Sequence, residues 1–598
     1  MEKRFIIFIV ISFVILAVWQ IVLERFYPRP QRSPNSLQQV TKLPEQHTAP
    51  QHTNDQKASE PVADSTAEVH PQLVTVDTPL WRAVFDNRGA VLRSFVLKAL
   101  PNGRPLLNSE YGQLEVISEE GLKRVGAPLR LAVANNAELS KKLNESLFEI
   151  DAPASEISVS KEATTQLSFK LRDASGTQVK KTFKFYGGKY TFDAIVEASH
   201  NGQPLDVNLL IGPNFGDQSV KKIDTYINTP QQAVIEHSNG QVEYVTAASL
   251  EHSGAAPDTL KEFSGGVDWI AACDHYFVMT LIAPKELPRA SIRNDFYTET
   301  AEGEQVYKHQ LSIEIPVLNG EQYTVFVGPK DHNLLLELSA QFKGRVDMEA
   351  LIDYGIFSFM VRPFIPLLDI LLKLFYKLTG NYGWAIVILT FVINMLLFPL
   401  RWKSSVAMKK TIKIQPRMKQ LQDEMKKLKP NDPRMQEIQM EQMKLMREGN
   451  PLTGCLPLLL QMPIFWAFFV FLSISIDIRH SPFIFWIKDL AAPDRTWILP
   501  ILMTIAMMAS TFLSPTPDDP AQRVQKYFTS FVMPIIFLIF FFANAPSGLV
   551  LYWMFSSIVS VAQQLVINKM TEEPEAEKLA PVDKAKRKEQ ARDLANAR

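Results

Sequence analysis

The chain has 598 residues, and its 63 Lys and Arg balance its 63 Asp and Glu. That length exceeds one ordinary domain, and a net charge of zero says nothing about charged partners. Apolar runs cluster at 5–23 and 360–567, while the middle of the chain has a soluble composition. The two cysteines, Cys273 and Cys455, fall in regions predicted below to occupy different compartments, so no disulfide framework is expected.

Residues 1–27 predict an N-terminal membrane anchor. Lys3 and Arg4 precede an apolar run that is longer than the core of a cleaved signal peptide, and no small-residue cleavage site follows it. We interpret the run as an uncleaved anchor rather than a removed signal, with the N-terminus in the cytoplasm. Residues 28–71 are rich in Pro, Gln, Ser and Thr and predict a flexible linker.

Residues 72–345 predict an antiparallel β-sandwich. Alternating apolar runs are separated by the hairpin turn signals Asn87-Arg-Gly89, Gly187-Gly188 and Asn319-Gly320, and no sustained helical period lies between them. Catalytic motifs and metal-ligand spacing of histidines are missing from this region. The domain is therefore expected to be a folded spacer and docking surface, and a cleft that binds a ligand or a protein stays open as an alternative.

Residues 346–380 predict an amphipathic helix in the membrane interface, because charged residues recur along an apolar body. Residues 381–401 then predict a transmembrane helix, with Asn394 near its middle and Arg401 at its end. These two residues are seven apart, about two helical turns, so they share nearly one face. Polar groups within a span indicate a functional site by default.

The rest of the chain predicts a cytoplasmic helical hairpin and four further spans. The hairpin at 402–450 carries an excess of Lys and Arg and a heptad of apolar residues. Alternation across the bilayer then places both termini in the cytoplasm and gives six transmembrane helices. The remaining segments are a span at 451–476, a periplasmic loop at 477–496, a span at 497–512, a cytoplasmic loop at 513–526, spans at 527–543 and 549–567, and a basic cytoplasmic tail at 568–598.

Polar side chains within these spans form the candidate site. One interpretation is a hydrated cavity between helices; the other is interhelical hydrogen bonding, with the arginine reaching to the cytoplasmic interface. The central parts of the spans lack Asp and Glu, which counts against an ion-coupled transporter. The candidates are Asn394, Arg401, Gln461, Ser556, Ser557, Ser560, Gln563 and Gln564.

Four segments closely resemble the YidC membrane-protein insertases: NPLTGCLPLLLQMPIF at 450–465, PFIFWIKDL at 482–490, ILPILM at 498–503 and PSGLVLYW at 546–553. The anchor and β-domain are similar in architecture to the Gram-negative form of the family, whose large domain is periplasmic. The resemblance implies a five-helix insertase core in the bacterial inner membrane. Its hydrophilic groove would open to cytoplasm and lipid and be closed toward the periplasm.

The resemblance also implies the activity. Such a protein inserts and folds nascent integral membrane proteins, alone or with the Sec translocon, and is not an enzyme and uses no cofactor or metal. The implied partners are nascent membrane proteins, the ribosome, the Sec translocon and the phospholipid bilayer, without direct nucleic-acid specificity. The groove arginine of the family falls where this chain has Asn394, so we hypothesise that Arg401 supplies the positive charge and that Asn394 is a neutral lining.

Two competing functions belong to other classes. A small-solute transporter with a periplasmic receptor domain is disfavoured by the missing intramembrane carboxylates and the absence of inverted repeats in the sequence. A tethered carbohydrate-acting enzyme is disfavoured because the β-domain sequence shows no catalytic constellation.

Overall fold

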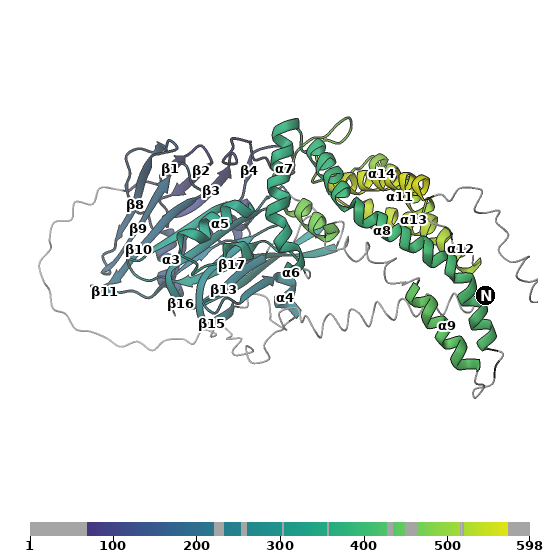
Figure 1. The fold of residues 1–598 in the computed structure, drawn as a ribbon. Coiled ribbons are helices and arrows are strands. Elements are labelled where there is room, and N and C mark those ends of the chain that lie inside the picture. Colours follow the sequence, from purple (N-terminus) through teal and green to yellow (C-terminus); the bar gives the residue numbers. More distant parts are fainter. Residues whose placement is uncertain are drawn as a thin grey trace, which may run out of the picture. The chain divides into compact units, whose positions relative to one another are not determined.

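The computed structural model describes residues 69–571, except 135, 214, 220–231, 253–259, 302–303, 356–357, 427, 429–433, 449–463, 515 and 517–519. The chain divides into a β-rich unit, which runs to Ser358 and also includes Ile474–Ile476, and a helical unit formed by the rest of the chain from Phe359 (Figure 1). The predicted anchor, nearly all of the linker, most of the predicted tail and Gln461 lie outside the described residues.

A small sheet forms one layer of the β-rich unit. Trp81, Ala83 and Phe85 alternate with more exposed residues and are fully buried, because successive side chains of a strand point to opposite faces. The strands, in spatial order, are β4 (Leu114–Glu115), β3 (Val91–Leu97), β2 (Trp81–Asp86), β1 (Leu73–Asp77) and β7 (Glu156–Ser158).

A 13-stranded sheet forms the other layer. Its main path runs β14 (Val242–Thr246), β13 (Gln232–His237), β15 (Leu260–Cys273), β16 (Phe277–Ala301), β18 (Gln322–Pro329), β10 (Thr191–His200), β9 (Thr177–Tyr186), β8 (Thr164–Arg172) and β6 (Glu149–Asp151). Off this path lie β11 (Gln203–Pro204), β12 (Val207–Ile211), β17 (Glu304–Pro316) and β5 (Arg130–Val133).

Aromatic side chains hold the two sheets together. The ring of Phe85 in β2 lies 5.0 Å from that of Phe183 and 5.5 Å from that of Phe185, both in β9. Trp81 reaches the same cluster, 5.8 Å from Phe185. Each such fully buried ring contributes roughly 2–3 kcal/mol of hydrophobic stabilisation. Two packed layers agree with the predicted sandwich.

Two details of the predicted sheet were wrong. The sheet is not purely antiparallel, because β1 and β7 pair in parallel, with Val76 opposite Ile157. The alternating runs around Asn319-Gly320 do not pair as a hairpin either. The 25-residue β16 pairs through its first part with β18 and through its last part with β17. A turn signal predicts that two strands meet at one end of a sheet, but it does not determine which strands they pair with.

Short helices in the β-rich unit were also missed. Helix α3 is capped by the side chain of Asn136, which accepts from the backbone N–H of Leu139, and it buries Leu143. Such short helices bury too few residues to show a period in the sequence. They are α2 (Glu119–Arg124), α3 (Ala137–Glu145), α4 (Ala247–His252), α5 (His332–Gln341) and the 3-10 helix η1 (Met348–Leu351).

The helical unit is built on one long helix. The predicted span and the first helix of the predicted hairpin are a single continuous helix, α8 (Tyr382–Met425). The other elements are α6 (Ser358–Val361), η2 (Arg362–Phe364), α7 (Ile365–Thr379), α9 (Arg434–Glu448), an unlabelled helix Ile464–Ile474, α11 (Ile498–Phe512), α12 (Pro520–Tyr527), η3 (Phe528–Val532), α13 (Met533–Phe537), η4 (Leu538–Phe542) and α14 (Ser547–Met570).

Three stretches of described helix are long and apolar enough to cross a bilayer: Tyr382–Ile412, Arg523–Phe542 and Ser547–Met570. The apolar helices Ile464–Ile474 and Ile498–Phe512 are shorter. The second stretch differs from a plain helix, because η3 and η4 within it are π-helical. Single π-helical turns often accompany functional positions in helices.

A buried lysine crosses the core of the β-rich unit. Lys181 of β9 is fully buried, and its Nζ donates to the carbonyl oxygens of Gly89 at 2.8 Å, Ala90 at 3.1 Å and Leu129 at 2.7 Å. Its ammonium thereby joins the β2–β3 turn to the start of β5. The three carbonyls favour the charged form, but burial outweighs them and lowers the pKa of Lys181 to about 7.

This lysine predicts a pH-dependent stability. The pKa of lysine in an unfolded chain is about 10.4. Between pH 7 and that value, the unfolded chain holds a proton that the folded chain has released. The free energy of unfolding therefore rises with pH, by up to about 1.4 kcal/mol per pH unit. Hydrogen exchange of the β9 amides in the full-length protein, corrected for intrinsic rates, measures this slope. The variant Lys181→Met should lose the slope, and an unchanged slope in that variant would refute the assignment.

Candidate functional site

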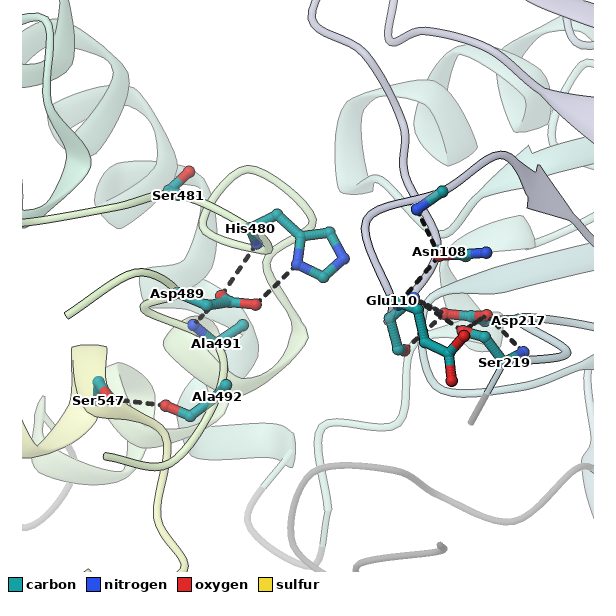
Figure 2. A network of polar contacts seen from close by, with 12 residues as sticks. Asn108, Glu110, Asp217, Ser219, His480, Ser481, Asp489, Ala491, Ala492 and Ser547 are labelled. Atoms are coloured by element: carbon teal, nitrogen blue, oxygen red, sulfur yellow. Dashed lines mark hydrogen bonds and ion pairs between the residues drawn. The ribbon is translucent and has the colours of Figure 1, made fainter. Parts of the chain in front are cut away.

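A structured loop fixes the starts of α8 and α14. The side chain of Asn381 caps α8 by accepting from the N–H of Gly383 at 2.8 Å. Its Nδ2 also donates to the carbonyl of Phe483 at 3.2 Å. On α14, Ser547 donates from its backbone N at 2.8 Å and from its Oγ at 2.7 Å to the carbonyl of Ala492 (Figure 2). Both helix starts are therefore tied to residues 477–496.

The loop itself is braced from within. Asp489 accepts from the ring Nδ1 of His480 at 2.7 Å through one oxygen. Through the other oxygen it accepts from the backbone N–H groups of His480 at 3.0 Å and Ala491 at 2.8 Å (Figure 2). Helix α7 joins the same loop through Lys373, which lies 2.9 Å from Asp369 and 3.5 Å from Asp477. The loop therefore sets the register in which these helices pack.

Polar side chains of α8 and α14 meet between the two helices. The Nδ2 of Asn394 lies 2.8 Å from the carbonyl oxygen of Thr390 and 3.4 Å from the Oγ of Ser556. Only 5% of each of the Asn394 and Ser556 side chains is exposed. Asn394 is thus a buried contact between helices, satisfied by its own helix and by α14.

Gln563 of α14 connects Asn394 to Arg401. Its Nε2 donates to the backbone carbonyl of Asn394 at 2.9 Å, and its Oε1 accepts from Arg401 Nη1 at 3.0 Å. The same nitrogen of Arg401 donates to Ser560 Oγ at 2.5 Å. Residues three and four apart lie on one helix face, so Ser556, Ser560 and Gln563 meet α8 together. Both acceptors that α14 presents here to the guanidinium are neutral.

The structure brings together five of the predicted site residues, which we call the α8–α14 polar row: Asn394, Arg401, Ser556, Ser560 and Gln563. Gln461 lies outside the described residues. Ser557 is buried, and no hydrogen bond is seen from it to the row. Gln564 donates to Asn568 at 3.0 Å and lies 3.5 Å from Ser405.

The sequence interpretation missed the continuation of the row. Lys409 of α8 donates from its Nζ to the Oγ1 of Thr571 at the end of α14. Four polar residues of α8 follow one another at steps of seven, four and four residues, which keeps them on one face of the helix. They are Asn394, Arg401, Ser405 and Lys409. That spacing is visible in the sequence and was a signal for these residues.

A separate polar network lies in the β-rich unit. The two oxygens of Asp217 accept from the backbone N and Oγ of Ser109 at 2.8 and 2.7 Å, and from those of Ser219 at 2.9 and 2.7 Å (Figure 2). These bonds saturate the carboxylate with donors from two loops. The network holds the loops together and offers no group for chemistry. Among the described residues, no cluster of His, Cys, Asp and Glu is arranged to hold a metal ion.

Comparison with known proteins identifies the family. Two family models match the chain, one described as the YidC periplasmic domain over residues 73–367 and one as a 60Kd inner membrane protein over residues 374–575. A membrane protein insertase YidC of Syntrophus aciditrophicus (strain SB) is 32% identical over 582 residues, which cover 95% of this chain and all of that relative. The chain belongs to the YidC family of membrane protein insertases.

Other YidC proteins are similar over nearly the whole chain. The relative from Geotalea daltonii is 29% identical over 587 residues, which cover 95% of this chain and 99% of that one. A crystal structure of an active YidC insertase with its first transmembrane domain resolved has 21% identity and a TM-score of 0.30, and covers 83% of this chain and 94% of that one. As a YidC family member, the chain is an inner membrane protein with a periplasmic domain.

The bridging role of Gln563 predicts a loss of stability in the variant Gln563→Leu. This change leaves the carbonyl of Asn394 without its donor from α14 and removes one acceptor of Arg401, so we expect a loss of about 1–2 kcal/mol. Unfolding of the full-length protein in mixed micelles measures the loss. The matched control is Leu565→Ala, whose side chain on the same helix is half exposed. Equal effects of the two changes would contradict the bridge.

Proposed function

We propose that this YidC family member inserts nascent integral membrane proteins into the inner membrane by way of the α8–α14 polar row. The observation that supports the proposal is Arg401, a cation held between two apolar helices by the neutral acceptors Ser560 and Gln563. A charge at such a position is costly to maintain, so it is expected to serve function.

The row would act on the hydrophilic part of a substrate. A polar or acidic segment that must cross the bilayer loses hydration, and a nearby guanidinium compensates part of that loss because charges interact strongly away from bulk water. Apolar residues of the substrate then partition into lipid. Each Leu, Ile, Phe or Val contributes a favourable insertion free energy of about 0.3–0.6 kcal/mol. Neither step requires a nucleotide, a metal or a covalent intermediate.

The proposed topology follows the predicted boundaries. The starts of α8, α11 and α14 would face the periplasm. Loop 477–496 contacts the starts of α8 and α14 and leads directly into α11. The long α8 and the helix α9 would form the cytoplasmic hairpin, joined by Arg417, whose Nη2 lies 2.8 Å from Glu441. Both termini would be cytoplasmic, with six spans in total. Ribosomes and the Sec translocon are the proposed partners on these two sides, besides the nascent chain and the bilayer.

The proposal assigns no enzymatic activity and no cofactor to the protein. The β-rich unit would serve as a spacer and docking surface in the periplasm. The transporter alternative predicts solute flux through liposomes that contain the protein and no nascent chain. Such flux would favour that alternative over insertion.

Arg401→Ala should reduce insertion of a substrate whose translocated segment is acidic. We expect a roughly fivefold to tenfold loss, equivalent to about 1–1.4 kcal/mol. Protease protection of the translocated segment in proteoliposomes measures it. The matched control is Lys403→Ala, which removes an exposed cation two residues away.

A second control uses the substrate. Replacing its acidic residues by Asn and Gln should abolish the difference between Arg401→Ala and the unchanged protein. Undiminished insertion of the acidic substrate by Arg401→Ala would refute the role of the arginine.

Crosslinking tests where the substrate lies. A photoreactive residue at positions 394, 401, 461 or 556 should form adducts with a stalled nascent membrane protein, whereas one at Ile558, a half-exposed position on α14, is the lipid-facing control. Adducts confined to the control position would refute passage along the polar row.

A further inference from the structure

The loop 477–496 and the residue that follows it present an aromatic tip, formed by Phe485, Trp486 and Trp497. Phe485 is 87% exposed, the largest exposed fraction of any large apolar side chain among the described residues, and Trp497 is 44% exposed. Single exposed apolar residues are common on proteins. The way in which this tip is built distinguishes it from such cases.

The tip is joined to the start of α11 by one ring contact and two hydrogen bonds. The ring of Trp486 stacks on that of Phe485 with 6.0 Å between centroids. Its Nε1 donates to Asp494 at 3.1 Å, and Asp494 also accepts from the backbone N–H of Leu499 at 2.8 Å, in the first turn of the helix. Phe485 is therefore linked through Trp486 and Asp494 to the first turn of α11.

The backbone at the tip adopts a costly conformation. Phe485 has φ +52° and Trp497 has φ +63°, both in the left-handed region that bulky side chains rarely occupy. Such conformations persist where the surrounding structure enforces them, and they gather at functional positions. Here both strained residues are aromatic, and both are exposed.

The surroundings of the tip match the surface of a bilayer. Immediately after the tip, α11 exposes an apolar stripe of isoleucine and leucine. Aromatic side chains at the end of such a stripe are typical of the level of the lipid headgroups, where one side of the ring can contact lipid and the other can face water. Lys488 and Arg495 are exposed in the same loop and could meet lipid phosphates. The stripe consists of Ile498, Ile501, Leu502 and Ile505.

We propose that the aromatic tip inserts into the headgroup region of the bilayer and anchors the end of the helical unit at which α8, α11 and α14 begin. The occupant of this surface is lipid, with phosphate groups near Lys488 and Arg495. The anchor would hold loop 477–496 at a fixed depth, and with it the starts of the helices that carry the polar row. The inference rests on the proposed span of α11.

Depth-dependent fluorescence quenching tests the anchor. In the full-length protein with Cys273→Ala and Cys455→Ser, the change Phe485→Cys introduces a site for an environment-sensitive fluorophore. The protein is reconstituted in vesicles of phosphatidylethanolamine and phosphatidylglycerol that carry a spin-label quencher either near the headgroup or near the end of the acyl chain. We expect the headgroup quencher to reduce emission at 485 about twofold more than at an aqueous control, Ala174→Cys, in the β8–β9 turn.

A third position separates this inference from the proposed topology. A fluorophore at Ile505→Cys, in the middle of the stripe, should be quenched most by the deep quencher. If it is, and emission at 485 is quenched no more than at 174, the anchor is refuted while the span stands. If emission at 505 is not quenched, the span of α11 fails and the anchor with it. Trp497→Cys gives a second probe of the tip, expected to respond as 485 does, should Phe485→Cys fail to fold.

Discussion

The helical unit depends on one constraint: a polar group between apolar helices must find its hydrogen-bond partner within the protein. Gln563 meets this requirement twice, because its amide donates to the backbone of Asn394 and accepts from Arg401. The pairing fixes the rotation of α14 about its axis relative to α8. A small rotation would separate these groups and leave several of them unsatisfied at once.

The same bonds hold Arg401 at the place where we propose that it acts. An arginine near the end of a span can relax toward the aqueous interface, where its charge has little effect on events within the bilayer. Here Ser560 and Gln563 hold the guanidinium against α14. The hydrogen bonds that join the helices also fix the position of the guanidinium, whereas a hydrated cavity between the helices stays a prediction.

The loop 477–496 plays the corresponding role at the helix starts. Its contacts with Asn381 and Ser547 add to the direct packing of the two helix starts. The bond between His480 and Asp489 braces this loop, which contacts the starts of both helices.

The sequence alone determined the division into a β-rich part and a helical part, the turns at Asn87-Arg-Gly89 and Gly187-Gly188, and the shared face of Asn394 and Arg401. These features follow from local periodicity and turn chemistry, which a single stretch of chain contains. Tertiary structure alone decided that β17 and β18 both pair with β16, that Lys181 is buried on three carbonyls, and that Gln563 joins Asn394 to Arg401. Such contacts connect residues far apart in the chain. The sequence on either side of a residue therefore does not indicate which distant group it will contact.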